Sequence, residues 1–388
     1  MPKSKVYCFF ILCLWVINTS NAQIITAAEQ TAAYLPLIKN KRIALVVNQT
    51  SCIKSTHLVD TLLSLGIKIK CLFAPEHGFR GNASAGTTVN NGRDERTKLK
   101  IISLYGNHKK PTAVDLDSIE AIIFDIQDVG VRFYTYISTM HYVMEAAAEM
   151  TIPMIVLDRP NPNGHYIDGP MLDTAYRSFV GMHKIPLVHG CTVGEIAQMI
   201  NGESWLKNGV QCSLKVITCL NYTHKTAYVL PIKPSPNLQT QSSIYLYPSL
   251  GLFEGTNMSM GQGTSTPYQC FGSPALDWGN YAFTPISIKG VSEKPKCLEI
   301  PCLGFNLTWY GNYRAYQESE INLNYLVLSY RLSKNKADFF TEFIDKLAGT
   351  SSLRKQIIAG KTVSEIRQSW QSGLDSYKIT RNKYLLYP

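Results

Sequence analysis

Residues 42–73, RIALVVNQTSCIKSTHLVDTLLSLGIKIKCLF, decide the fold class of this chain. An apolar run of strand length opens the segment at residues 42–48, and a second one closes it at 67–73. Between them, residues 56–65 carry the spacing of an amphipathic helix, which ends at Gly66. A strand, a helix and a second strand joined by short connections form the unit from which parallel sheets are built. The segment therefore predicts an α/β fold.

The same alternation continues along the chain and predicts further strands at 121–126, 152–157 and 213–219, with helices at 139–150 and from about Thr192. This pattern is typical of a mainly parallel sheet with helices on both faces.

The composition changes at about Cys270, after which glycine, proline and aromatic residues dominate as far as Tyr313. Helices are expected at Ala337–Leu347 and from Val363, where Thr362 and Glu365 form a capping box. We therefore predict one domain over residues 23–265 and a smaller α+β domain over 266–388.

The first 22 residues have the pattern of a secretory leader. Lys3 and Lys5 precede the apolar run 6–17, and residues 20–22 supply the small side chains that a signal peptidase reads. The run is short for a membrane span, although an uncleaved anchor is the alternative. We therefore expect an exported protein, periplasmic or extracellular, in a bacterium.

Charge and cysteines exclude some classes of function. The formal net charge is +10, but Lys and Arg are scattered, so no nucleic-acid-binding patch is expected. Eight cysteines follow the leader, and Cys297 and Cys302 are close enough in sequence to form a disulfide across a short loop. No CxxC or HExxH pattern is present, so no metal site is predicted.

Three polar loops follow three of the predicted strands. Strand 67–73 leads into PEHGFRG at 75–81, strand 121–126 leads into 127–134, and strand 152–157 leads into DRPNPNG at 158–164. Because ligands bind beyond the carboxyl ends of the strands in open parallel sheets, we expect these loops to form one pocket.

The first loop carries a candidate acid. Glu76, between a proline and a histidine, is a candidate general acid, with His77 orienting it or contacting substrate. Arg80 is a candidate for a substrate carboxylate. The structural alternatives are that Glu76 caps a helix or pairs with Arg80, and that Arg80 forms an internal ion pair with Glu76 or Asp94.

The second loop supplies Asp125 and Asp128. Asp125 is placed to bind sugar hydroxyls, and Asp128 is a candidate catalytic carboxylate or, beside Gly130, a turn residue. Arg132 and Tyr134 are candidate substrate contacts, with Arg132 facing a carboxylate, or they begin the next helix.

The third loop offers Asp158, Arg159, Asn161 and Asn163 as candidate substrate-binding residues. The two asparagine amides suit sugar hydroxyls, whereas the prolines between them fit a rigid structural turn equally well.

Two later segments add candidates. His189 is a candidate substrate contact, and it precedes Thr192 and Glu195, which we interpret as a capping box. Glu254 follows an aromatic run and is either the second catalytic carboxylate or a residue that holds the adjacent glycine-rich turn.

The sequence motifs of several enzyme classes are absent from this sequence. There is no G-x-S-x-G elbow, no P-loop and no G-x-G-x-x-G after the first strand, so neither a serine hydrolase nor a nucleotide cofactor is expected. The carboxylate, histidine, arginine and amide groups that remain suit glycoside hydrolysis.

Five motifs in this order and spacing resemble the exo-β-N-acetylmuramidase family NamZ. They are PEHGFRG with Ala85-Gly86, DIQDVGVRFYTYISTM, LDRPNPNG with Gly169-Pro170, HGCTVGE, and LFEGTN. The match extends from about residue 40 to the C-terminus, where Tyr384-Leu385-Leu386-Tyr387 resembles the family's ending. Two positions depart from the pattern: Cys191 stands where Met is expected, and Gln262 where Arg is expected.

The resemblance implies a Rossmann-like catalytic domain, a smaller C-terminal domain and a cleft between them. It implies removal of terminal N-acetylmuramic acid from the non-reducing ends of peptidoglycan fragments, with Glu76 as the catalytic residue and no cofactor. Glu254 or Asp128 is then expected to activate water or steer the substrate's acetamido group. The alternatives are a non-catalytic peptidoglycan-fragment binding protein and a hydrolase of another cell-wall bond, such as a stem-peptide amide.

Overall fold

The computed structural model of the chain describes residues 23–80 and 91–388. The predicted leader at 1–22 therefore lies outside the described residues, as do Gly81 and the Ala85-Gly86 part of the first motif.

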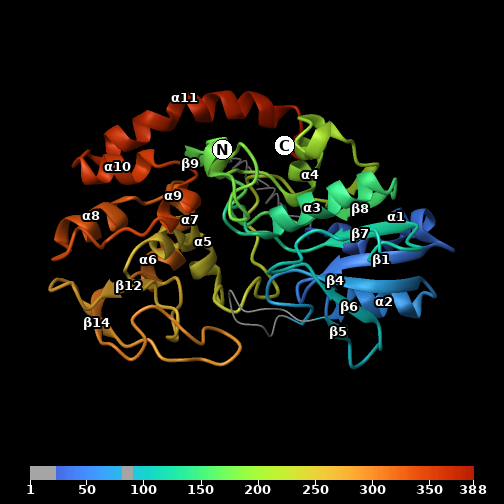
Figure 1. Cartoon of the computed structure of the whole chain (residues 1–388), viewed down its shortest axis with the longest axis horizontal. Helices are drawn as coiled ribbons and strands as arrows, with labels where there is room; N and C mark the ends of the chain where they lie inside the picture. Colours follow the sequence, from blue (N-terminus) through green and yellow to red (C-terminus); the bar gives the residue numbers. More distant parts are fainter. Residues whose placement is uncertain (1–22, 81–90) are drawn as a thin grey trace, which may run out of the picture.

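A seven-stranded sheet forms the centre of the N-terminal half (Figure 1). Six strands are parallel, and only the short edge strand β5 runs antiparallel to its neighbour β6. This confirms the mainly parallel sheet predicted from the alternation of strands and helices. In spatial order the strands are β11 (Leu214–Ile217), β8 (Met154–Leu157), β7 (Ala121–Asp125), β1 (Arg42–Val47), β4 (Lys68–Ala74), β6 (Lys100–Ser103) and β5 (Gly92–Arg93).

Helices cover both faces of the sheet, which explains why β1 is apolar throughout. Ile43, Leu45 and Val47 pack in one core with α1 (Thr31–Ile38) and α2 (Leu58–Ser64). Ala44 and Val46 point to the opposite core, which includes α3 (Tyr136–Glu149) and α4 (Val193–Gly202). Since successive side chains of a strand alternate between faces, only a sheet covered on both sides buries them all.

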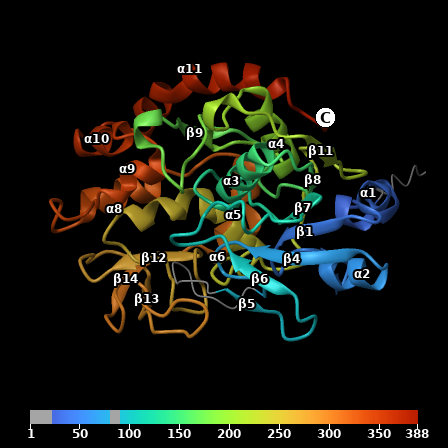
Figure 2. The same ribbon diagram turned by 45° about the vertical axis from the view of Figure 1, so that its right-hand side comes forward.

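The C-terminal half, taken here from α5 onward, is smaller and mixed, as the predicted fold class requires, although the predicted boundary at residue 265 placed α5 and Glu254 in the first domain. An antiparallel sheet in the order β12-β14-β13 lies at its lower edge in Figure 2. Its strands are β12 (Cys270–Ser273), β13 (Tyr281–Phe283) and β14 (Cys302–Asn306). The helices of this half are α5 (Gln241–Leu250), α6 (Thr308–Tyr313), α7 (Ala315–Glu318), α8 (Asn324–Leu332), α9 (Phe343–Ala348), α10 (Ser352–Ile358) and α11 (Val363–Asn382). Two small antiparallel pairs complete the fold, β2 (Cys52–Ile53) with β3 (Thr56–His57) and β9 (Asp168–Met171) with β10 (Pro186–Val188).

Helix α11 runs across both halves of the molecule (Figure 1). It begins with the predicted capping box, in which Thr362 accepts from the Glu365 amide and Glu365 accepts from Thr362. The chain then returns to the N-terminal half, where the Tyr387 hydroxyl donates to Oδ2 of Asp158 at 2.6 Å. The C-terminal segment therefore ties the two halves together.

The helix predicted at Ala337–Leu347 is shorter than expected, since α9 begins only at Phe343. The preceding residues pair instead with the segment around Gly255. Asn257 N donates to Phe339 O, and Thr341 N donates to Gly255 O, both at 2.9 Å. Backbone pairing with a distant segment has replaced the local helical hydrogen bonds.

All eight cysteines that follow residue 22 are free thiols, including Cys297 and Cys302. Within residues 23–80 and 91–388, no helix is both long and apolar enough to cross a membrane.

Candidate active site

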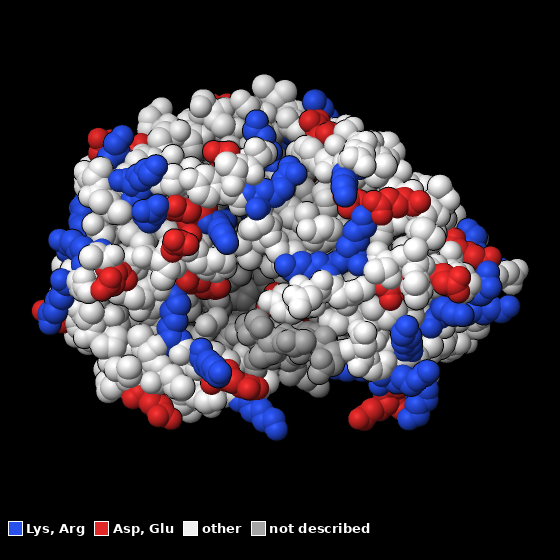
Figure 3. All heavy atoms as spheres, in the orientation of Figure 1, with Lys and Arg blue, Asp and Glu red and all other residues white. Residues whose placement is uncertain are grey.

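A cavity of about 370 Å³ lies where the two halves of the chain meet. The surface is hollowed between these halves in the space-filling view (Figure 3). Segments far apart in sequence contribute its lining: Glu76, His77, Tyr105, Phe133, Tyr134, Thr135, Tyr136, Phe179, Val180, Ser235, Asn237, Leu238, Tyr247, Glu254, Gln262, Tyr268 and Phe343.

Glu76 enters the cavity from the end of β4. The strand ends at Ala74, and the Gly78 amide donates to Pro75 O at 3.0 Å, which closes a tight turn around Glu76. His77 has a positive φ of 68°, a conformation that non-glycine residues adopt only where the surrounding structure holds them. The turn therefore projects Glu76 and His77 together beyond the sheet edge.

Two hydroxyl-bearing side chains lie beside the Glu76 carboxylate. Thr135 Oγ1 donates to Glu76 Oε2 at 3.1 Å. Tyr105 lies close enough that burial first, and then the charge of Glu76, raise the pKa of its phenol. Glu76 is therefore held in place from the side of β7 and from the side of β6.

Glu254 faces the same cavity from the C-terminal half. It lies in a short 3₁₀ turn, Gly251–Gly255, and Tyr268 Oη donates to its Oε1 at 2.5 Å. Burial raises the pKa of Glu254 and the charge of Glu76 raises it further, whereas the Tyr268 hydrogen bond and Lys296 lower it. The net direction is upward, which favours the protonated acid.

The turn that carries Glu254 is fixed by two close contacts. Lys296 Nζ donates to the carbonyls of Phe253 (3.0 Å), Glu254 (2.8 Å) and Thr256. A Cβ at Gly255 would lie 2.4 Å from Cα of Ile344 on α9, so only glycine allows this approach.

Tyrosine rings form much of the remaining wall. Tyr134 and Tyr136 meet edge to face with centroids 4.7 Å apart, and Tyr247 meets Tyr268 in the same way at 5.0 Å. The Tyr134 hydroxyl donates to Pro234 O at 2.8 Å. Two carboxylates among aromatic faces and hydroxyls can bind a sugar ring and move protons at its glycosidic oxygen.

Of the predicted site residues, Glu76, His77, Tyr134 and Glu254 line this cavity. Other predicted site residues are not among the described residues that line this cavity, and each has internal contacts instead. They are Arg80, Asp125, Asp128, Arg132, Asp158, Arg159, Asn161, Asn163 and His189. The expectation that all three strand-end loops form one pocket is therefore corrected.

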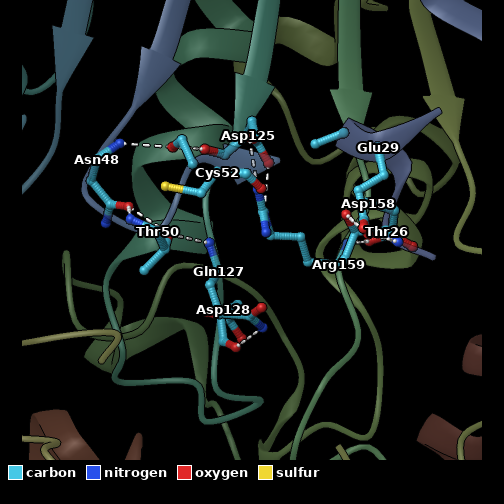
Figure 4. Close-up of polar contacts among 12 residues, drawn as sticks. Thr26, Glu29, Asn48, Thr50, Cys52, Asp125, Gln127, Asp128, Asp158 and Arg159 are labelled. Carbon is cyan, nitrogen blue, oxygen red and sulfur yellow. Dashed lines mark hydrogen bonds and ion pairs between the residues drawn. The ribbon is translucent and has the colours of Figure 1, made fainter. Parts of the chain in front are cut away.

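Asp125 and Arg159 form a buried ion pair (Figure 4). Arg159 Nε lies 2.6 Å from Asp125 Oδ1, and Nη2 lies 2.9 Å from Oδ2. Asp125 is fully buried, so sugar hydroxyls do not reach it.

Asp128 is a turn residue, which was the structural alternative to a catalytic role. Its Oδ2 accepts from the Gly130 amide at 2.7 Å and lies 3.7 Å from Nε2 of the fully buried His189. Neither residue lines the cavity, so the catalytic and substrate-binding expectations for them are corrected.

The DRPNPNG loop is built as a structural turn. Asn161 Nδ2 donates to Cys191 O at 2.8 Å, and its Oδ1 accepts from the Asn163 amide at 2.8 Å. Asn163 Nδ2 donates to Val129 O at 2.9 Å. Because these amides are satisfied internally, the expectation that they bind sugar hydroxyls is corrected.

Asp158 anchors the start of α4. Its carboxylate accepts from Thr192 Oγ1 (2.7 Å) and Gly194 N (2.8 Å), while Thr192 and Glu195 form the predicted capping box. Burial raises the pKa of Asp158 to about 6. This carboxylate holds the fold together and is not exposed to a ligand.

The two arginines proposed for a substrate carboxylate point elsewhere. Arg132 is fully buried, and its guanidinium donates to the carbonyls of Pro170, Ile185, Leu347 and Ala348 at 2.6–3.1 Å. Arg80 pairs with Asp94 at 2.8 Å, which is the internal ion pair considered as its alternative.

Sequence reasoning missed several cavity residues, above all Tyr105, Thr135, Tyr247 and Tyr268. Thr135 and Tyr247 lie in or next to motifs that were singled out, but their polar atoms gave no signal on their own. Among the described residues, no group of three or more His, Cys, Asp or Glu side chains is placed to hold a metal ion.

Family models and known proteins resemble this chain over most of its length. The model described as exo-beta-N-acetylmuramidase NamZ, N-terminal, matches residues 43–242, and its C-terminal counterpart matches 245–387. The peptidoglycan beta-N-acetylmuramidase NamZ of Bacillus subtilis is 39% identical over 374 residues, which cover 91% of this chain and 89% of that protein.

Two crystal structures of DUF1343 family proteins from Bacteroides fragilis have the same fold. One superposes with a TM-score of 0.88 at 45% identity, and the other with 0.81 at 28% identity. Each superposition covers 94% of this chain and 99% of the other protein.

Proposed function

Because the chain belongs to the NamZ family of exo-β-N-acetylmuramidases, we infer that it is a glycoside hydrolase acting on peptidoglycan fragments. It releases terminal N-acetylmuramic acid from their non-reducing ends. The observation in this molecule that carries the mechanism is the meeting of Glu76 and Glu254 in one cavity, one from each half of the chain.

We propose that these two carboxylates share the chemistry. Glycosidases need one group that protonates the leaving oxygen. They also need an ionised group, which acts as a base or a nucleophile or positions a reacting group of the substrate. Burial raises the pKa of Glu254 above that of an ordinary glutamate, which is the direction of shift that a proton donor needs. Glu76 then acts as the carboxylate, positioned by the Thr135 hydroxyl. This division of roles is the reverse of the one expected from sequence, where Glu76 was the acid.

The tyrosine wall supports substrate binding in this proposal. Aromatic faces of Tyr134, Tyr247 and Tyr268 offer stacking surfaces for a pyranose ring, while Ser235 and Asn237 add polar atoms to the lining. Gln262 donates to Tyr268 Oη at 3.1 Å, so the residue that replaces the expected arginine acts on Glu254 through Tyr268.

We also propose that the protein is exported. The pattern of residues 1–22 supports a cleaved leader, and a peptidoglycan substrate lies outside the cytoplasmic membrane of a bacterium. A peptidoglycan-derived glycan or muropeptide is the proposed partner.

Product analysis tests the reaction. Purified enzyme is incubated overnight with muropeptides and with peptide-free glycan fragments that carry N-acetylmuramic acid at the non-reducing end, and the products are identified by mass spectrometry. Free N-acetylmuramic acid from the non-reducing end, together with a fragment shortened by that one residue, is the expected product. Saturable binding without any product would support a binding protein instead, and loss of a peptide would indicate an amidase.

A further inference from the structure

The order of strands creates a second place where a ligand is expected. From β1 the chain moves outward through β4 and β6, and it then returns to add β7, β8 and β11 on the other side. In sheets of this order, the crevice beyond the carboxyl ends of the two central strands is the usual ligand site, because the loops diverge there. Here those strands are β1, which ends at Val47, and β7, which ends at Asp125.

A cavity of about 520 Å³, within the usual size of ligand sites, opens beside this crevice. Its lining residues Thr50 and Cys52 follow β1, and Arg159, which follows β8, pairs with Asp125 at the end of β7. It is lined by Gln23, Ile24, Thr26, Glu29, Thr50, Cys52, Lys54, Arg159, Tyr228, Val229, Pro231 and Ile232. None of these residues lines the cavity of Glu76 and Glu254. One segment separates the two, since residues 228–232 line this cavity and 235–238 line the catalytic one.

Arg159 brings an unused donor to this cavity. Only 4% of its surface is exposed, and its Nε and Nη2 atoms are occupied by Asp125 and by the Cys52 carbonyl at 3.1 Å. Within the part of the chain that the structure describes, no group accepts from Nη1. Nη1 keeps access to solvent in the cavity, and a carboxylate bound there would accept from it in a charge-assisted hydrogen bond.

Glu29 brings an unused acceptor. Its Oε2 accepts from Thr26 N (2.7 Å) and Thr26 Oγ1 (2.8 Å), whereas no described residue donates to Oε1. The Ala27 amide donates to Asp158 O at 3.2 Å, which holds this turn against the residue before Arg159 (Figure 4). Tyr228 lines the same cavity as Arg159 and Glu29, and burial raises the pKa of its phenol.

We propose that this cavity binds a small zwitterion of the α-amino acid class, with its carboxylate on Nη1 of Arg159 and its ammonium on Oε1 of Glu29. Asp125 already neutralises Arg159, so the net charge comes from Glu29 and from Lys54 at the rim. These two cancel, which suits a ligand of no net charge. Ile24, Val229 and Ile232 form an apolar side against which an aliphatic side chain packs.

Cys52 provides a local reporter of occupancy, because it is a free, partly buried thiol in the lining. The full chain is treated with a methanethiosulfonate reagent at mildly alkaline pH, and modification of each cysteine is followed by peptide mass spectrometry. L-leucine and D-leucine are the probes. At ten times its Kd, a bound ligand leaves about one site in eleven open, so labelling of Cys52 slows about tenfold. Cys297, a partly buried thiol of the C-terminal half, is the internal control whose rate stays unchanged.

Two analogues test the two charges separately. The α-hydroxy acid of leucine lacks the ammonium, and isoamylamine lacks the carboxylate, so neither slows Cys52 labelling at the same concentration. Equal protection by either analogue would overturn the zwitterion assignment. Failure of both leucine enantiomers to slow labelling would overturn the site itself. N-acetylmuramic acid is included to show whether the reaction product occupies the cavity instead, which would also contradict the proposal.

Two substitutions complete the test. Glu29→Gln keeps the acceptor for Thr26 but loses the charge, and Arg159→Lys keeps a cation for Asp125 but loses the Nη1 edge. Both are expected to abolish protection by leucine while the Cys297 rate remains that of the wild type. If Arg159→Lys fails to fold, protection by leucine is measured in Glu29→Gln and in Val229→Asp instead. Val229 is 68% exposed, so a carboxylate at this position is expected to be tolerated by the fold. Undiminished protection in these variants would overturn the proposal, whatever the outcome of the hydrolysis assay.

Discussion

The Tyr268 hydroxyl donates a hydrogen bond of 2.5 Å to Oε1 of Glu254, and Gln262 donates to the same hydroxyl. This contact lowers the pKa of Glu254 while burial and the charge of Glu76 raise it. The protonation of Glu254 therefore depends on a balance that single substitutions can shift.

Tyr268→Phe removes a contact that favours the charged form of Glu254, so the pKa of Glu254 rises further. Since a general acid is lost as pH rises through its pKa, the basic limb of the kcat/KM profile is expected to move to higher pH. The profile is measured with a soluble muramide substrate, and Tyr313→Phe, on an exposed ring, is the control. An unchanged basic limb would show that Glu254 does not set it.

Leaving-group chemistry separates the roles of the two carboxylates. A good leaving group needs little protonation, so Glu254→Gln is expected to keep much more activity on a para-nitrophenyl muramide than on a disaccharide. Glu76→Gln is expected to lose activity on both. The opposite pattern, with Glu76→Gln rescued by the good leaving group, would assign the acid role to Glu76.

Arg132 and Arg80, the two arginines predicted to bind a substrate carboxylate, are expected to contribute differently to the stability of the fold. Arg132→Met leaves four backbone carbonyls without their donor in the buried junction between the halves, which is expected to cost about 3 kcal/mol or more. Arg80→Met breaks one ion pair whose arginine is 38% exposed, and the expected cost is roughly 1 kcal/mol or less. Urea unfolding measures both, and equal losses would contradict the burial argument.

The raised pKa of Asp158 is expected to make the free energy of unfolding depend on pH. Burial raises its folded pKa from 3.8 to about 6, so the folded state binds more protons than the unfolded state between these values. Its contribution is therefore present below pH 3.8 and lost as pH rises through 6, by up to about 3 kcal/mol at 1.4 kcal/mol per unit. Asp158→Asn should remove this slope from the free energy of unfolding. A slope identical to that of the wild type would rule out the raised pKa.

Sequence patterns predicted the sheet well because its strands are buried on both faces. A run such as Ile43 to Val47 leaves few alternatives to a covered parallel strand. The helix expected at Ala337–Leu347 was less predictable, because pairing of Phe339 and Thr341 with the segment around Gly255 depends on a contact between distant parts of the chain.

The site was predictable only in part, for a physical reason. A polar loop at a strand end has the same composition whether its side chains face a ligand or satisfy buried backbone groups. Glu76 lines the cavity, whereas Asn161 and Asn163 satisfy backbone groups inside the protein. The choice depends on where the C-terminal half packs, and no local pattern reports that. The hydrogen bond from Tyr268 to Glu254 could not be predicted for the same reason, because it depends on tertiary packing.

If Glu76 and Glu254 act together as the catalytic carboxylates, substitution of either one must slow the release of N-acetylmuramic acid from a peptide-free disaccharide. Glu76→Gln and Glu254→Gln are each expected to lower kcat/KM about a hundredfold or more. Asp128→Asn, a matched change at a carboxylate outside the cavity, is expected to stay within about threefold of the wild type, because an asparagine oxygen still accepts from Gly130. Wild-type activity in Glu76→Gln or Glu254→Gln, or a loss in Asp128→Asn as large as theirs, would show that these two carboxylates are not the catalytic pair.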